Sequence, residues 1–101
     1  MVRLLAQPGG RPALLDALHR YADALVDAEP QTEAFVMCLD PQEANAVWLF
    51  EWFASPEGQD QHRASQPFAE LVSELSGILA EEPQALPLEP LRMHINYRPE
   101  P

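Results

Sequence analysis

Two periods of hydrophobic residues divide the chain into strands and helices. The apolar run of residues 2–6 predicts a short strand, which ends at Pro8-Gly9-Gly10. From Pro12 to Glu29, apolar side chains recur every three or four positions, which indicates an amphipathic helix. A second helical stripe begins at Pro67 and is expected to end at Glu81-Glu82-Pro83. The stripes consist of Leu14, Leu18, Tyr21 and Leu25 in the first helix and of Phe68, Leu71, Val72, Leu75, Ile78 and Leu79 in the second.

Strands are expected between and after these helices. Residues 32–39 and 46–54 predict two strands, and the polar turn between them predicts a hairpin. Ser55 suits the N-cap of a short helix that ends before Pro67. Residues 84–96 predict a last strand, irregular or at a sheet edge because Pro87 and Pro90 cannot donate hydrogen bonds. Residues 97–101 are expected to form a loose tail.

The resulting β-α-β-β-α-β order predicts an α+β fold of the ferredoxin-like kind, with an antiparallel sheet. The 101 residues suit one domain, residues 1–101. The helices would cover one face of the sheet, and the other face also carries large apolar side chains. We therefore expect a homodimer in which a second subunit covers that face and completes an α+β barrel.

Charge and cysteine content narrow the class of protein. The formal net charge of −10 argues against binding to nucleic acid or to an anionic membrane, because phosphates would be repelled. The single cysteine, Cys38, rules out an internal disulfide and a cysteine-rich zinc site, and its apolar neighbours predict a buried thiol. No signal peptide and no apolar run long enough to span a membrane are visible, so a cytoplasmic protein is expected.

The aromatic face of the third predicted strand is the first candidate site. Trp48, Phe50 and Trp52 alternate onto one face, where they could line a cavity for a flat ring system. Equally, they could fill the core of the dimer. Glu51 lies on the opposite face among apolar residues, so it is either held by a structural hydrogen bond or is a base with a raised pKa.

Among the histidines, His62 is the candidate for proton transfer, although a structural or surface role is also open. His19 is expected at the surface. His94 would share a face with Arg92 and Asn96, either as a polar patch or as a solvated edge. No zinc motif, phosphate-binding loop or dinucleotide fingerprint is present, so an enzyme with this sequence is expected to need neither metal nor nucleotide.

Several short motifs resemble the antibiotic biosynthesis monooxygenase family, whose members include quinol-monooxygenase-like proteins. The His62 segment is similar to the family's histidine followed by Ser-Pro-His-Phe, except that Pro67 replaces the second histidine. The matching motifs are Pro8-Gly9-Gly10, Glu29-Pro30, Phe50-Glu51-Trp52 with Ser55 and Glu57, and His62 followed by Ser65-Gln66-Pro67-Phe68.

The resemblance implies a monooxygenase without metal or flavin, acting on an aromatic substrate of the quinol or polyketide type. It implies His62 and Trp52 as catalytic residues, and Trp48, Phe50 and Trp52 as substrate-binding residues. Trp52 matches the Trp of the Asn-x-x-x-Trp motif of anthrone-oxidising relatives, although Trp48 replaces the Asn, and Gly58 and Val72 replace their Tyr and Arg. The Trp and His of haem-degrading relatives fall at His62 and Val72, which argues against haem degradation. The alternatives are a binding module for a small aromatic ligand and a structural dimer with a filled barrel.

Overall fold

The computed structural model describes residues 1–96, and they form a four-stranded sheet with three helices. The predicted β-α-β-β-α-β order is confirmed, with the short helix before the last long one. The elements are β1 (Val2–Leu5), α1 (Arg11–Ala28), β2 (Thr32–Leu39), β3 (Ala46–Phe53), α2 (Pro56–Ala64), α3 (Gln66–Leu75) and β4 (Gln84–Ala85).

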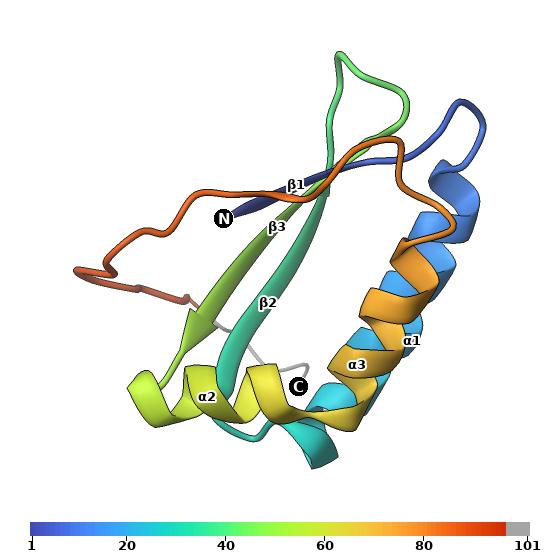
Figure 1. The fold of residues 1–101 in the computed structure, drawn as a ribbon. Helices are drawn as coiled ribbons and strands as arrows, with labels where there is room; N and C mark the ends of the chain where they lie inside the picture. Colours follow the sequence, from blue (N-terminus) through green and yellow to red (C-terminus); the bar gives the residue numbers. More distant parts are fainter. Residues whose placement is uncertain (97–101) are drawn as a thin grey trace, which may run out of the picture.

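The sheet has the strand order β2-β3-β1-β4, and every neighbouring pair is antiparallel. The predicted hairpin is β2–β3, in which Phe35 lies opposite Glu51. Helices α1 and α3 lie side by side over one face of the sheet, and α2 crosses its end (Figure 1). This is the predicted ferredoxin-like α+β fold.

The hydrophobic core lies between the sheet and the helix pair. The predicted stripe of α1 places Leu14, Leu18 and Tyr21 in this core, where each is at most 3% exposed. Side chains at alternate positions of β1 and β3 meet them, because alternate residues of a strand point to the same face. The buried members from the sheet and from α3 are Leu4, Val47, Leu49, Leu71 and Leu75.

Helix α3 ends at Leu75, earlier than the predicted Glu81-Glu82-Pro83. The backbone beyond it forms tight turns, and Ala80 then donates its N–H to the carbonyl of Leu5 at 2.8 Å. An isolated bridge also pairs Leu79 with Ala6. The apolar stripe continues past Leu75 because Ile78 and Leu79 still pack on the core. Their N–H groups bond to the carbonyl of Leu75, but the carbonyl of Ile78 accepts from the N–H of Gln7, just after β1.

The last strand is much shorter than the predicted 84–96. Only Gln84 and Ala85 pair with β1, and residues 86–96 form no regular element. This segment contains Pro87 and Pro90, which lack the N–H that a ladder requires. The expected loose tail, 97–101, lies outside the described residues.

The face of the sheet without helices carries Trp48, Phe50 and Trp52, which are partly exposed in the single chain. Cys38 lies directly opposite Trp48 and is exposed, so the prediction of a buried thiol is wrong for the single chain. The reason is the register of β2, which turns Cys38 away from the helices. No helix within residues 1–96 is both long and apolar enough to span a membrane.

Candidate functional site

A buried carboxylate, Glu29, is the centre of a polar cluster between the helices and the start of β2. The residue follows α1 directly and is only 1% exposed. Its Oε2 accepts hydrogen bonds from the hydroxyls of Tyr21 at 2.6 Å and Ser65 at 2.7 Å. Its Oε1 accepts one from the Thr32 hydroxyl at 2.9 Å and lies 2.8 Å from Nδ1 of His62. Four polar side chains from α1, β2, α2 and the α2–α3 junction therefore converge on one carboxylate.

His62 is the only imidazole of the described residues that is buried, with 7% of its surface exposed. Its Nδ1 also lies 2.7 Å from the Tyr21 hydroxyl. The imidazole ring packs against Phe68, at 4.2 Å between ring centroids, and against Phe53, at 5.2 Å. A surface role for His62 is therefore wrong, and the ring is fixed by packing and by hydrogen bonds together.

The local sequence explains why His62 points inward. Ser55 caps α2 by accepting the N–H of Gly58 at 3.2 Å, and Pro56 follows at the first helical position. Ser65 ends α2 with extended backbone and caps α3 by accepting the N–H of Phe68 at 3.1 Å. The two caps set the bend between the helices, which brings His62 and Phe68 together over the sheet.

The electrostatics of the cluster favour an ionised Glu29. Burial alone raises the pKa of this carboxyl, but the hydrogen bonds, with that of Tyr21 the strongest, outweigh it and hold the pKa below its usual value. The same environment raises the pKa of Tyr21, first through burial and then through the hydrogen bond to Glu29. Tyr21 therefore stays protonated and acts as a donor.

A second carboxylate, Glu51, has a contrasting environment. It lies on β3 opposite Phe35 and faces the helices, as predicted from strand alternation. It is half-buried and makes no hydrogen bond to the other described side chains. Burial raises the pKa of Glu51, and the charge of His62 partly offsets this effect. Of the two roles predicted for Glu51, the structural hydrogen bond is not found among the described residues, whereas a raised pKa is.

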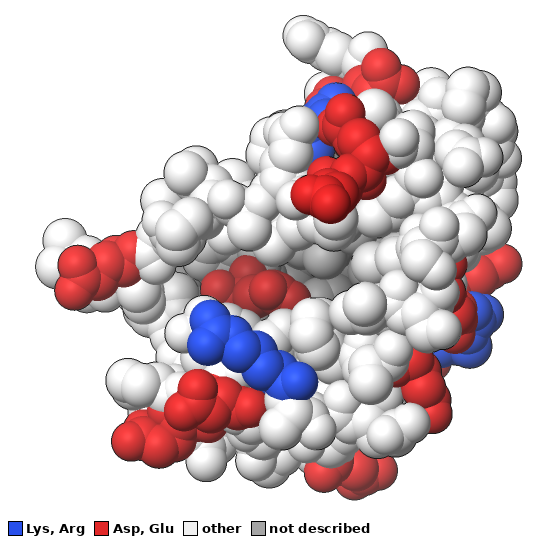
Figure 2. All heavy atoms as spheres, in the orientation of Figure 1, with Lys and Arg blue, Asp and Glu red and all other residues white. Residues whose placement is uncertain are grey.

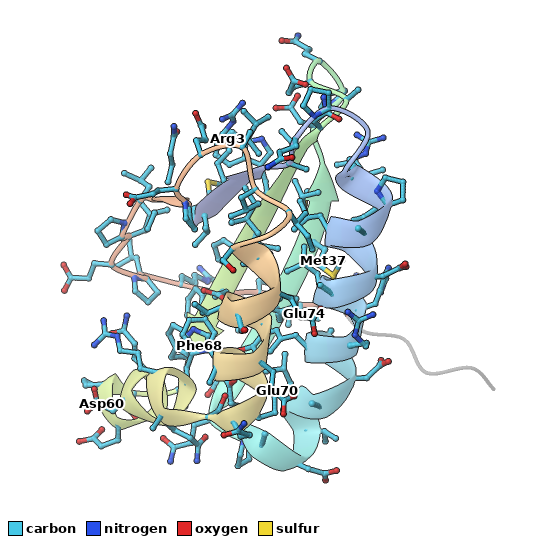
Figure 3. The ribbon with its side chains drawn as sticks, turned by 45° about the vertical axis from the view of Figure 1, so that its right-hand side comes forward. Arg3, Met37, Asp60, Phe68, Glu70 and Glu74 are labelled. Carbon is cyan, nitrogen blue, oxygen red and sulfur yellow. The ribbon has the colours of Figure 1, made fainter. Side chains whose placement is uncertain are left out.

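The surface is hollowed in front of the strands. Figure 2 shows this hollow with acidic side-chain atoms at its floor, between α2 and the part of the chain that follows α3. In Figure 3, Phe68 lies on the side of α3 toward the sheet, and Asp60 lies at the outer side of α2. Phe68 is partly buried against the core, so the apolar wall beside His62 comes from α3.

The predicted site residues fall on two faces of the sheet. His62 lies on the helix-covered face, where it contacts Phe53. Trp48, Phe50 and Trp52 lie on the opposite face, with Phe50 and Trp52 at 6.4 Å between ring centroids. The indole N–H of Trp48 donates to Oδ2 of Asp40 at 3.0 Å. Within one chain, the structure therefore does not bring Trp52 and His62 into one cavity.

The remaining predicted polar residues lie at the surface. His19, His94, Arg92 and Asn96 are all exposed, as expected for His19 and for a solvated edge. Sequence reasoning missed the roles of Glu29, Tyr21 and Ser65, because they are distant in sequence and Tyr21 reads as a core residue of α1. Within residues 1–96, no group of three or more His, Cys, Asp or Glu side chains is placed to hold a metal ion.

Fold and cluster together define a small α+β domain with an antiparallel ferredoxin-like sheet and a buried Glu–His–Tyr cluster under its helices. The profile of one family, antibiotic biosynthesis monooxygenase, matches residues 1–74. The chain belongs to this family. No curated protein matches the sequence.

Solved structures show the same fold. The Rv0793 protein of Mycobacterium tuberculosis superposes with a TM-score of 0.81 at 22% identity, covering 91% of this chain and 92% of that one. An antibiotic biosynthesis monooxygenase superposes with a TM-score of 0.79 at 14% identity, covering 90% and 95%. The protein NE2512 of Nitrosomonas europaea, of unknown function, is 29% identical with a TM-score of 0.70, covering 88% and 90%.

Proposed function

We propose that this protein is a cofactor-independent monooxygenase that acts on an aromatic small molecule of the quinol or polyketide type. In such a reaction, a base removes a proton from the substrate and the electron-rich anion reacts with dioxygen. For a ring methylene the balance is CH2 + O2 giving C=O and H2O, so that one oxygen atom enters the substrate and the other leaves as water. The protein needs to bind the substrate, accept a proton and exclude bulk water.

The observation that carries this proposal is the environment of His62. A histidine held by Glu29 and Tyr21 and packed against two phenyl rings is pre-oriented for proton transfer. The neighbouring phenyl rings of Phe53 and Phe68 offer an apolar surface to a flat substrate. Membership of the family supports the class of reaction.

The role of the aromatic strand face follows from the expected homodimer. Val36, at 45% exposed, adds to the apolar surface made by Trp48, Phe50 and Trp52. We propose that a second copy covers this face and that these rings bound a cavity in the dimer interior. Within one chain the sheet separates that cavity from His62, so Trp52→Ala tests the aromatic face independently of His62→Ala. The single domain of residues 1–101 and the cytoplasmic location stay predictions.

The test is oxygen uptake by the purified protein, freed of metal by a chelator, with a panel of hydroquinones and anthrones and with product analysis. We expect saturable uptake above the uncatalysed rate and a loss of about 100-fold or more in His62→Ala. The exposed His19→Ala is the matched control and should keep the wild-type rate. Full activity in both His62→Ala and Trp52→Ala would refute the residue assignments.

Two outcomes favour the alternatives. Tight binding of one compound without turnover would indicate a binding module, whereas neither turnover nor binding would favour a structural dimer.

Sedimentation tests the proposed homodimer separately. Phe50→Asp places a charge in the proposed interface and should yield a monomer, whereas an unchanged mass would refute this interface.

A further inference from the structure

We propose that Glu29 is a positioning residue that holds the proton of neutral His62 on Nδ1 and thereby leaves Nε2 as the nitrogen that accepts the substrate's proton. The second half of this statement rests on the proposed function. The first half concerns hydrogen positions in the resting protein, and it can be tested without a substrate.

The lone pairs of Glu29 limit how many donors this carboxylate can accept. An ionised carboxylate offers about four acceptor positions, two on each oxygen. Oε2 receives the Tyr21 and Ser65 hydroxyls, and Oε1 receives the Thr32 hydroxyl, each within 2.9 Å. One position remains on Oε1, and the atom placed at it is Nδ1 of His62, at 2.8 Å.

The proton on this last contact must come from the imidazole. The Tyr21 hydroxyl has one proton, and its 2.6 Å contact to Oε2 places that proton toward Glu29. If Nδ1 carried no proton, its lone pair would face that of Oε1 at 2.8 Å, and two acceptors would repel each other inside the protein. With the proton on Nδ1, all contacts become donor–acceptor pairs, and Nδ1–H is shared between Oε1 and the Tyr21 oxygen at 2.7 Å.

The other ring nitrogen is left free by this arrangement. Nε2 makes no hydrogen bond to the described residues, and among them no buried side-chain nitrogen or oxygen lacks a partner. Nε2 therefore reaches the solvent-accessible surface, although the residue as a whole is 7% exposed. The ring contacts Phe53 of β3 and Phe68 of α3, so this opening lies where α2, α3 and the sheet meet.

Glu29 itself is a poor base in this arrangement. All of its acceptor positions are occupied, and it has no access to a substrate. Its contribution is to fix the tautomer and orientation of the ring and to stabilise the imidazolium that forms when Nε2 takes a proton, a role known for carboxylates behind catalytic histidines. Tyr21, as a second partner of Nδ1, restricts rotation of the ring.

The first experiment is ¹⁵N NMR of the full chain labelled at histidine, over a pH range from about 6 to about 10, where an ordinary imidazole becomes neutral. His62→Gln identifies the signals of His62 by their loss. We expect the neutral ring to carry its proton on Nδ1. A neutral ring with its proton on Nε2, or a ring that keeps both protons throughout, would overturn the proposal.

The second experiment uses Glu29→Gln, which preserves the shape of the side chain. Its amide group can donate to Nδ1, so we expect a mixture of tautomers in place of one. The exposed Glu33→Gln should leave the tautomer unchanged, and so should Tyr21→Phe, which keeps the Glu29 contact. A single Nδ1–H tautomer in folded Glu29→Gln would refute the positioning role.

Activity provides the third readout. With a substrate that the wild type turns over, Glu29→Gln should lower kcat by about 10-fold or more while KM changes by less than about 2-fold, because only the proton transfer is affected. An unchanged kcat would refute the positioning role. If no substrate is turned over, the monooxygenase proposal and the Nε2 role both fail, whereas the tautomer assignment stands or falls on the NMR result.

Discussion

Replacing Glu29 by Gln should also destabilise the folded protein by an amount that the hydrogen bonds of the cluster determine. The four donors around the carboxylate come from separate elements of the chain. A glutamine side chain fits the same space but has one carbonyl oxygen, and its amide nitrogen is itself a donor. Two of the four donors therefore face the amide nitrogen, in a site that is 1% exposed, and each loses its acceptor unless it reverses its hydrogen bond, as a change of tautomer would do for His62.

The magnitude follows from the cost of each unpaired donor. A buried polar group without a partner costs about 1–3 kcal/mol, so two of them should cost roughly 2–6 kcal/mol. Domains of this size are stable by about 5–15 kcal/mol, so the variant should remain largely folded at room temperature. Thr32→Val removes one donor while the carboxylate keeps the others. It should therefore lower the free energy of unfolding by about 1 kcal/mol, less than Glu29→Gln does.

The assay is urea unfolding followed by far-ultraviolet circular dichroism at neutral pH, with the free energy of unfolding taken by linear extrapolation. All variants must be compared at one protein concentration, since a dimer's apparent stability depends on it. Glu33→Gln, at an exposed position of the same strand as Thr32, should change the free energy by less than about 0.5 kcal/mol. A loss below about 1 kcal/mol in Glu29→Gln, at an unchanged urea dependence, would refute the hydrogen-bond count.

Three further predictions concern the same region. Because the folded pKa of Glu29 lies below its ordinary value of 4.5, this residue stabilises the protein above that value, and its contribution is lost as the pH falls through the folded pKa. Urea unfolding at a series of acid pH values should therefore show that the free energy of unfolding falls more steeply with decreasing pH for the wild type than for Glu29→Gln. Parallel plots of this free energy against pH would contradict the prediction. The pKa of Glu51 is raised by burial, so its charge destabilises the fold at neutral pH. Glu51→Gln should therefore raise the melting temperature at neutral pH but not at a pH well below 4.5, where the carboxyl is protonated in the folded and the unfolded protein alike. An equal rise in melting temperature at both pH values would exclude a charge effect. Ser55→Ala removes the cap on Gly58 and should cost about 1 kcal/mol, with Ser73→Ala on the exposed side of α3 as the control.

The sequence predicted the fold well because its main signals are local and agree with one another. The stripe of α1, the β2–β3 hairpin and the Ser55-Pro56 start of α2 each depend on neighbouring residues, and all three are confirmed. The end of α3 was missed because Ile78 and Leu79 keep the helical spacing, although the Ile78 carbonyl and the Ala80 N–H already bond to Gln7 and Leu5. Such competition between a local pattern and a distant strand is not encoded in periodicity.

The site was predicted less completely. His62 was identified by its residue type, but its partner Glu29 lies 33 positions earlier, and only the tertiary fold brings the two together. The available signal was Glu29-Pro30, a carboxylate directly after a helix and before a proline, together with Ser65 at a helix junction. Strand alternation correctly separated Glu51 from the Trp48/Phe50/Trp52 face. It could not show on which of the two faces His62 lies, because that depends on how the chain turns after Phe53.

The two carboxylates near His62 differ in the chemistry they allow. Glu29 is surrounded by donors, so neither a proton nor a substrate can approach it without breaking those bonds. Glu51 has no hydrogen-bond donor among the described residues, and burial raises its pKa, so it can hold or release a proton at little structural cost. In the proposed reaction, a proton taken from a substrate by Nε2 of His62 therefore cannot pass on to Glu29. That proton must return to the product, leave with water, or reach Glu51. Activity of Glu51→Gln therefore tests whether the proton passes through Glu51, even if this substitution stabilises the fold.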